Sequence, residues 1–113
     1  MINCKSGDVV VLEVIFSNGS GTKKRPALVI SSDDYHAGRS EIIIAAITSN
    51  IKRVLTGDSP IENWKKAGLL YPSIVTGVIQ TVKRNMIIRK LGRLSESDYK
   101  KVKMNLGKAM LYS

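Results

Sequence analysis

The strongest constraint on the fold is a series of short apolar stretches rich in β-branched residues, separated by polar or glycine-containing segments. Such residues favour an extended backbone, and runs of this length bounded by turn-forming residues are typical of strands. Two of the stretches, 26–32 and 41–47, are apolar at consecutive positions, which indicates strands covered on both faces. The expected strands span residues 8–16, 26–32, 41–47, 73–82 and 86–91.

The segments between these strands carry clear turn and loop signals. Residues 17–22 combine two glycines with small polar residues and predict a loop able to lie over a ligand. Residues 33–40 predict a turn or a second loop. The sequence Lys83-Arg84-Asn85 predicts a hairpin turn between the last two strands.

Two segments predict helices. Ser59-Pro60-Ile61-Glu62 fits a helix start, and a short helical turn should end near Ala67, before Gly68. Residues 95–98 resemble a capping box with aspartate in place of glutamate, and the apolar residues that follow recur at helical spacing. That apolar stripe, which should pack on the sheet, is Tyr99, Val102, Leu106 and Ala109.

These elements together predict the fold class. Five or more short strands, brief connections and a terminal helix indicate a mainly β (α+β) protein. The expected architecture is an SH3-like β-barrel with short helices and a C-terminal helix. A chain of 113 residues is long enough to bury a core, so we expect one domain over residues 1–113.

Positive charge points to the kind of partner. The net charge is +9, and residues 1–58 hold 7 basic and 6 acidic side chains whereas residues 59–113 hold 11 and 3. Lys83 to Arg93 contains five basic residues and no acid. Such a segment favours a polyanion, because phosphate contacts release counterions. Nucleic acid is the expected partner, and an acidic protein is an alternative or an addition.

The remaining composition limits compartment and cofactors. Cys4 is the only cysteine, which excludes a disulfide framework and a cysteine-based zinc site and favours a reducing cytoplasm. No apolar run approaches the ~18 residues of a membrane span, so no membrane partner is expected. The adjacent acids Asp33 and Asp34 would point apart on a strand, so we expect no metal site and no cofactor.

A basic cluster before a proline is the leading functional candidate. Lys23, Lys24 and Arg25 precede Pro26 and the apolar run that begins at Ala27. Proline removes a backbone donor and biases the preceding residue toward an extended conformation. This predicts Arg25 at the mouth of a strand, on a rigid support; a solvated surface cluster is the alternative.

Five segments, in order, resemble the signatures of the MazF/PemK toxin family. The resemblance is collinear from about residue 6 to residue 105. The segments are Gly7–Val10, Ser20–Ser31, Ala45–Ser49, Ala67–Leu69 with Pro72–Ser73, and Lys90–Ser95.

The resemblance implies a sequence-selective endoribonuclease that cleaves single-stranded RNA. It also implies the toxin of a toxin–antitoxin pair, a homodimer silenced by a small acidic antitoxin. The family's catalytic arginine and threonine correspond to Arg25 and Thr48. The residues that we expect to contact RNA are Ser20, Thr22, Lys23, Lys24, Ser49, Asn50, Gln80, Thr81, Lys83 and Arg84.

The sequence departs from the family pattern at one position. Many relatives carry an acid two residues after the threonine that corresponds to Thr81, whereas this chain has Lys83. A reversed charge beside the groove is expected to alter cleavage preference or antitoxin contacts. It does not alter the expected reaction.

RNA cleavage without a metal sets three chemical tasks. The 2′-hydroxyl must lose its proton, the phosphorane must be stabilised, and the departing 5′-oxygen must be protonated, which gives 2′,3′-cyclic phosphate and 5′-hydroxyl ends. Arg25 suits the second task, and Thr48 can hydrogen-bond to the phosphate or the 2′-hydroxyl. The general base stays open: a guanidinium is a poor base, and His36, Asp8 and Glu13 are candidates.

Two alternatives come from other functional classes. A catalytically silent SH3-like module that only binds RNA would share the basic surface. A gyrase-targeting toxin similar to CcdB would share the barrel but grip a protein instead of RNA. The presence of both Arg25 and Thr48 favours the nuclease.

Overall fold

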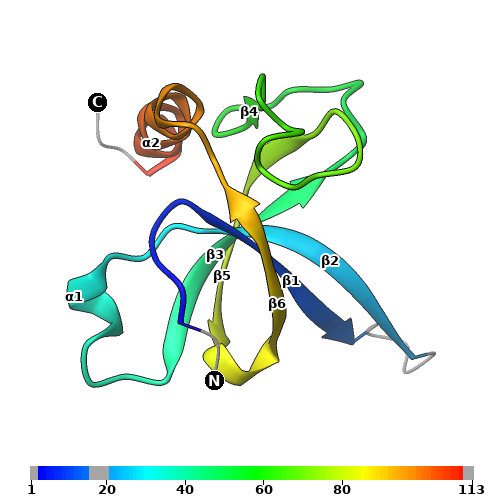
Figure 1. Ribbon diagram of the computed structural model, residues 1–113. Helices are drawn as coiled ribbons and strands as arrows, with labels where there is room; N and C mark the ends of the chain where they lie inside the picture. The colour runs from blue at the N-terminus through cyan, green and yellow to red at the C-terminus, as the bar shows by residue number, and fades with distance from the viewer. Residues whose placement is uncertain (1–2, 16–20, 111–113) are drawn as a thin grey trace.

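The computed structural model describes residues 3–15 and 21–110, which form one curled antiparallel sheet with a helix at its C-terminal end (Figure 1). Mainly β architecture with a barrel-like sheet and a C-terminal helix is confirmed. The helical elements are α1 (Asp33–His36), the 3₁₀ turn η1 (Arg84–Met86) and α2 (Glu96–Ala109). The strands are β1 (Asp8–Ile15), β2 (Thr22–Val29), β3 (Glu41–Thr48), β4 (Ser59–Pro60), β5 (Ile74–Lys83) and β6 (Ile87–Arg93), in the spatial order β4-β5-β3-β2-β1-β6.

Strand β2 begins earlier than the sequence predicts, and this changes the position of Arg25. It pairs with β1 from Thr22 to Leu28 but with β3 only from Ala27 to Val29. Arg25 therefore lies within a strand, opposite Leu12 of β1, and the prediction that it sits at a strand mouth is wrong on the β1 side. On the β3 side, however, it lies beyond the last paired residue.

Pro26 explains why the β2–β3 ladder stops. The backbone N–H of Ile30 donates to the carbonyl of Ile43, and hydrogen-bonded pairs recur every second residue in an antiparallel ladder. The pattern makes Pro26 the next donor position toward β3 after Leu28, and proline has no N–H to donate. The ladder with β1 is undisturbed, because the nitrogen of Pro26 faces β3 and not β1. From Pro26 back toward Thr22, the edge of β2 that faces β3 is therefore unpaired.

Two other predictions about local structure are wrong. Ser59 and Pro60 form β4, paired with β5, so they do not start a helix; residues 62–68 form consecutive turns instead. Lys83–Asn85 does not form a hairpin turn, because β6 pairs with β1 on the far side of the sheet. Both errors arise because long-range strand pairing overrides local preference. The end of the first predicted strand, at residue 16, and residues 17–20 of the predicted loop lie outside the described part of the chain.

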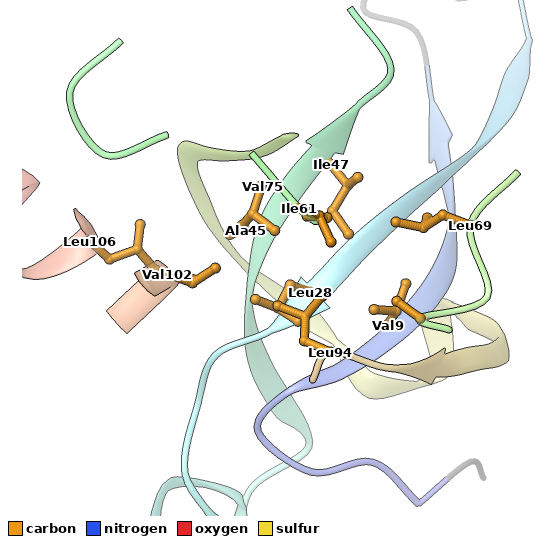
Figure 2. Close-up of a cluster of buried hydrophobic side chains, with 11 residues drawn as sticks. Val9, Leu28, Ala45, Ile47, Ile61, Leu69, Val75, Leu94, Val102 and Leu106 are labelled. Atoms are coloured by element: carbon orange, nitrogen blue, oxygen red, sulfur yellow. The ribbon is translucent and has the colours of Figure 1, made fainter. Parts of the chain in front are cut away.

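Hydrophobic side chains pack on both faces of the sheet. One cluster joins β1, β2, β3 and β5 to Val102 and Leu106 of α2, as Figure 2 shows. These two residues confirm the central part of the predicted helical stripe; Ala109 is exposed. The other cluster lies on the opposite face and comprises Cys4, Val10, Leu12, Ala27, Val29, Ile42, Ile44 and Ile87. None of the helices formed by the described residues has the length and apolar character of a membrane-spanning segment.

Buried carboxylates connect elements that are far apart in sequence. The side chain of Asp8 is inaccessible to solvent and pairs with Arg93 and, at 3.2 Å, with Lys90. Asp98 accepts the backbone N–H groups of Glu62 and Asn63 at 3.2 and 2.9 Å. Ser95 caps α2 as predicted, but Asp98 does not complete the capping box because its carboxylate holds the 62–68 turns.

Two glycines let the 62–68 turns approach β6. A Cβ added to Gly68 would lie 2.3 Å from the carbonyl oxygen of Leu91, and one added to Gly92 would lie 2.6 Å from that of Ala67. Gly68 also has a positive φ of 87°. No other residue type fits this contact without displacing backbone. The two segments are thereby fixed side by side.

We expect Gly68→Ala to lower the free energy of unfolding by about 3 kcal/mol or more, because it combines left-handed strain with backbone overlap. Gly38→Ala is the matched control: φ is 75° there and nothing lies within 4 Å of the added Cβ. This control should lose only about 1–2 kcal/mol. Denaturant unfolding of both variants checks the difference, and equal losses would show that the contact with β6 is not tight.

Candidate functional site

A cleft of about 770 Å³ opens where β2 and β3 separate. Its walls come from the part of β2 that is paired with β1 but not with β3, from the end of β3, from the segment that follows the 62–68 turns, and from β6. The polar and charged residues that line it are Lys24, Arg25, Thr48, Ser49, Tyr71, Ser73, Gln80 and Arg89. The cleft thus combines basic, hydroxyl and amide side chains with an apolar floor.

Sheet register places Arg25 and Thr48 on one face. Ala27 and Ala46 are the last pair of the β2–β3 ladder, and Arg25 and Thr48 each lie two residues beyond that pair on their own strands. Side chains alternate between faces, so both residues share the face of Ala27 and Ala46. Gln80 of β5 is opposite Ile44 of β3. Ile44 and Thr48 point to the same face of β3, so Gln80 belongs to that face as well. The open gap left by Pro26 therefore lies between Arg25 and Thr48.

Local hydrogen bonds hold the end of β3 in place. The hydroxyl oxygen of Thr48 accepts the backbone N–H of Asn50 at 3.1 Å, and the side-chain oxygen of Asn50 accepts that of Lys52 at 3.3 Å. Thr48 can still donate its own hydroxyl hydrogen. Arg25 is exposed, and no ion pair with an acid is found for it among the described residues.

The other predicted contact residues lie in several places. Thr22 is bonded to Glu13 at 2.8 Å near the β1–β2 connection, and Lys23 is exposed beside it. Asn50 and Thr81 are exposed but do not line the cleft. Ser20 lies outside the described residues.

Lys83 and Arg84 lie away from the cleft, at the other end of β5. Lys83 pairs with Glu41 at 3.0 Å, seven residues along β3 from Thr48. This ion pair lowers the pKa of the half-buried Glu41 carboxyl. The side chain of Arg84 donates to the carbonyl oxygens of His36 and Arg39, each at 3.4 Å. The structure does not bring these two basic residues to Arg25.

None of the three candidate bases lines the cleft. Asp8 is buried with its basic partners, Glu13 is bonded to Thr22, and the Nε2 atom of His36 lies 2.6 Å from the hydroxyl oxygen of Ser31. The residues that line the cleft include no carboxylate and no imidazole. Among the described residues, no three His, Cys, Asp or Glu side chains lie together as metal ligands.

Residues 5–110 match the family of PemK-like, MazF-like toxins of type II toxin–antitoxin systems. The chain belongs to this family. Toxins of the PemK/MazF family are endoribonucleases, so the chain is a member of an enzyme family.

Solved structures show the same fold. An endoribonuclease in complex with its cognate antitoxin from a mycobacterial species is 15% identical, with a TM-score of 0.77 and 98% of each chain covered. The Mycobacterium tuberculosis toxin MazF-mt6 is 22% identical, with a TM-score of 0.73 and with 92% of this chain and 98% of that chain covered. A MazE–MazF structure from Deinococcus radiodurans is 18% identical, with a TM-score of 0.75 and full coverage of both chains. No curated protein sequence matched.

Several cleft residues of this PemK/MazF chain were not predicted as site residues. Arg89 belongs to a basic run in which Lys90 and Arg93 pair with Asp8, and nothing in the sequence separates the three. Tyr71 reaches the cleft because the Gly68 contact places its segment there. The available sequence signal was Gly68 and Tyr71, close together between two predicted strands. Their place beside the cleft, however, depends on the fold.

We expect His36 to make stability depend on pH. Burial, and secondarily the charge of Arg84, lower the pKa of His36 below 6.5, whereas Asp33 opposes the shift. As pH falls, the unfolded chain takes up this proton before the folded chain does. The contribution of His36 to the free energy of unfolding is therefore fully present above about pH 6.5 and is lost as pH drops toward the folded pKa. His36→Gln should flatten this fall, measured by urea unfolding between about pH 8 and pH 5.5. Equal slopes in both proteins would contradict it.

Proposed function

We propose that this PemK/MazF chain cleaves single-stranded RNA, including mRNA, sequence-selectively in the cleft between β2 and β3, without a metal ion. The observation that carries the proposal is that Arg25 and Thr48 both line the cleft, each two residues beyond the last β2–β3 pair and on the same face as that pair. A cation and a hydroxyl group on the two sides of that gap suit a phosphodiester held between them.

Substrate binding is assigned to the rest of the cleft. Lys24 and Arg89 add positive charge for neighbouring phosphates. Tyr71 is 64% exposed and offers an aromatic ring on which an unpaired base can stack. The amide of Gln80 can donate to and accept from a base edge, which suits sequence selection.

Arg25 and Thr48 are assigned different parts of the chemistry. The nucleophile is the 2′-hydroxyl of the RNA, and its attack on phosphorus builds negative charge on the non-bridging oxygens. The guanidinium of Arg25 stabilises that charge through two parallel hydrogen bonds. The Thr48 hydroxyl donates to the phosphate or accepts from the 2′-hydroxyl. Because no carboxylate or imidazole lines the described cleft, water accepts the 2′-hydroxyl proton and water protonates the departing 5′-oxygen, and the rate enhancement rests chiefly on charge stabilisation.

The donor set of the cleft supports a reaction independent of metal. Mg²⁺ in phosphoryl-transfer sites is held by one or two carboxylates together with substrate oxygens. The described cleft residues supply guanidinium, ammonium, hydroxyl and amide groups but no carboxylate. The positive charge that a metal would supply is here carried by Lys24, Arg25 and Arg89.

The products should identify the nucleophile. Incubation with a long RNA is expected to give fragments with 2′,3′-cyclic phosphate and 5′-hydroxyl ends, because the 2′-oxygen displaces the 5′-oxygen. Cutting should persist in excess EDTA, and an oligonucleotide with deoxyribose at the cleavage position should bind but stay whole. End-group analysis by mass spectrometry checks the first point. Loss of cutting on chelation would refute the metal-independent route.

Two substitutions should separate the catalytic residues from background charge. Arg25→Ala is expected to lower kcat by about 10²-fold or more, because a preorganised charge is lost from the phosphorane. Thr48→Ala should cost less. Lys100, exposed on α2 and outside the cleft lining, provides the control Lys100→Ala, which removes the same charge. Single-turnover cleavage rates check the order, and an Arg25→Ala rate equal to that of the control would remove Arg25 from the site.

The partners proposed are a second copy of this chain and a small acidic antitoxin, in the cytoplasm where mRNA is translated. Leu70, Val78 and Ile88 line the cleft and are 81%, 58% and 37% exposed, which supports a surface covered by another chain. Two of the similar structures contain an antitoxin. Sedimentation at micromolar concentration should show a dimer of about twice the 12.4 kDa chain mass. A species of single-chain mass alone would rule out the homodimer.

A further inference from the structure

A second cavity, of about 320 Å³, lies away from the cleft and shares no lining residue with it. Residues from the N-terminal segment, α1 and η1 surround it, among them Asn3, Lys5, Asp33, His36 and Arg84. Both cavities border the same hydrophobic cluster: Ala27 and Ile44 of that cluster line the cleft, and Cys4 lines the second cavity. They therefore open at different ends of one sheet face.

The guanidinium of Arg84 is incompletely bonded. Its side-chain hydrogen bonds go to two carbonyl oxygens at 3.4 Å, near the limit for such bonds. The Nε atom is buried and finds no acceptor among the described residues. None of the ion pairs of the described chain involves Arg84: Asp8 and Glu41 pair with other basic residues, and Asp33, which lines the same cavity, forms none. Buried donors of this kind normally have a partner.

The other groups of the cavity suit an anion. Lys5 also lacks an ion pair among the described residues, and Asp33 is the one carboxylate in the lining, so Lys5 and Arg84 leave net positive charge there. The hydroxyl oxygen of Ser31 accepts the backbone N–H of Ile43 at 3.0 Å and lies 2.6 Å from Nε2 of His36. The Ser31 hydroxyl can then donate its hydrogen to Nε2 of His36. In the neutral ring Nδ1 therefore carries the N–H and is a donor.

We propose that this cavity binds a phosphate group, held by Arg84 and Lys5 with His36 as an additional donor. A guanidinium fork matches two oxygens of a phosphate, and an ammonium adds charge. The phosphate can belong to a nucleic-acid strand that extends from the cleft, since Gln80 in the cleft and Arg84 are separated by about 13 Å of extended chain. It can also be a free phosphate ion. Neither source requires that the chain cleaves RNA.

The first test is an NMR titration of the ¹⁵N-labelled full chain with inorganic phosphate, against chloride at equal ionic strength. Saturable shifts of Lys5, His36 and Arg84 with phosphate, but not with chloride, are expected. Arg84→Gln should abolish them. Lys83→Gln is the matched control, because it removes the same charge from the neighbouring residue, which pairs with Glu41 outside the cavity. Equal shifts with both salts, or shifts retained in Arg84→Gln, would overturn the proposal.

The second test identifies the source of the phosphate. A single-stranded DNA oligonucleotide offers phosphates but no 2′-hydroxyl, so its binding is independent of cleavage. If the phosphate is part of a strand, Arg84→Gln should weaken binding about three-fold or more beyond Lys83→Gln and reduce the salt slope by about one unit. Unchanged oligonucleotide affinity with lost phosphate shifts assigns a free ion. Should Arg84→Gln fail to fold, Lys5→Gln serves in both tests, since the Lys5 hydrogen bond to Asp8 uses only its backbone.

Discussion

One missing hydrogen-bond donor shapes the functional half of this molecule. Pro26 lies at the position where β2 would next donate to β3, and without that N–H the ladder ends at Ala27 and Ala46. The two strands then separate while β2 stays fully paired with β1. Arg25 is consequently exposed at an open strand edge yet carried by a rigid ladder. A central strand is an unusual place for proline, and here it produces the cleft.

The walls of the cleft depend on groups that never enter it. Asp8, buried at the start of β1, pairs with Lys90 and Arg93 and leaves Arg89 as the basic residue of β6 that lines the cleft. Gly68 and Gly92 allow the turns before Tyr71 to lie against β6. Two segments that resemble family signatures, Ala67–Leu69 and Lys90–Ser95, are therefore explained by packing and by charge pairing. Their role is to position the residues that face the substrate.

Local sequence predicted the elements better than their partners. Strands β1, β3 and β5 and the cap at Ser95 could be found because turn residues and apolar runs act over a few positions. The pair Arg25 and Thr48 was expected only from the resemblance to a toxin family. The pairing of β6 with β1, and of Ser59–Pro60 with β5, involves segments distant in sequence, and no local pattern specifies it. For the same reason a continuous basic run could not reveal that Arg89 lines the cleft whereas Arg84 lines a second cavity.

Arg25 and Thr48 should act as one unit, because both line the cleft from the two strands that separate beyond Ala27 and Ala46. A double-mutant cycle on kcat/KM for RNA cleavage, with Arg25→Ala, Thr48→Ala and the double variant, measures this directly. We predict that the double variant retains about 10-fold more activity than the product of the two single losses allows, since both residues stabilise one transition state. Losses that multiply independently would contradict a shared site across the open strand edge.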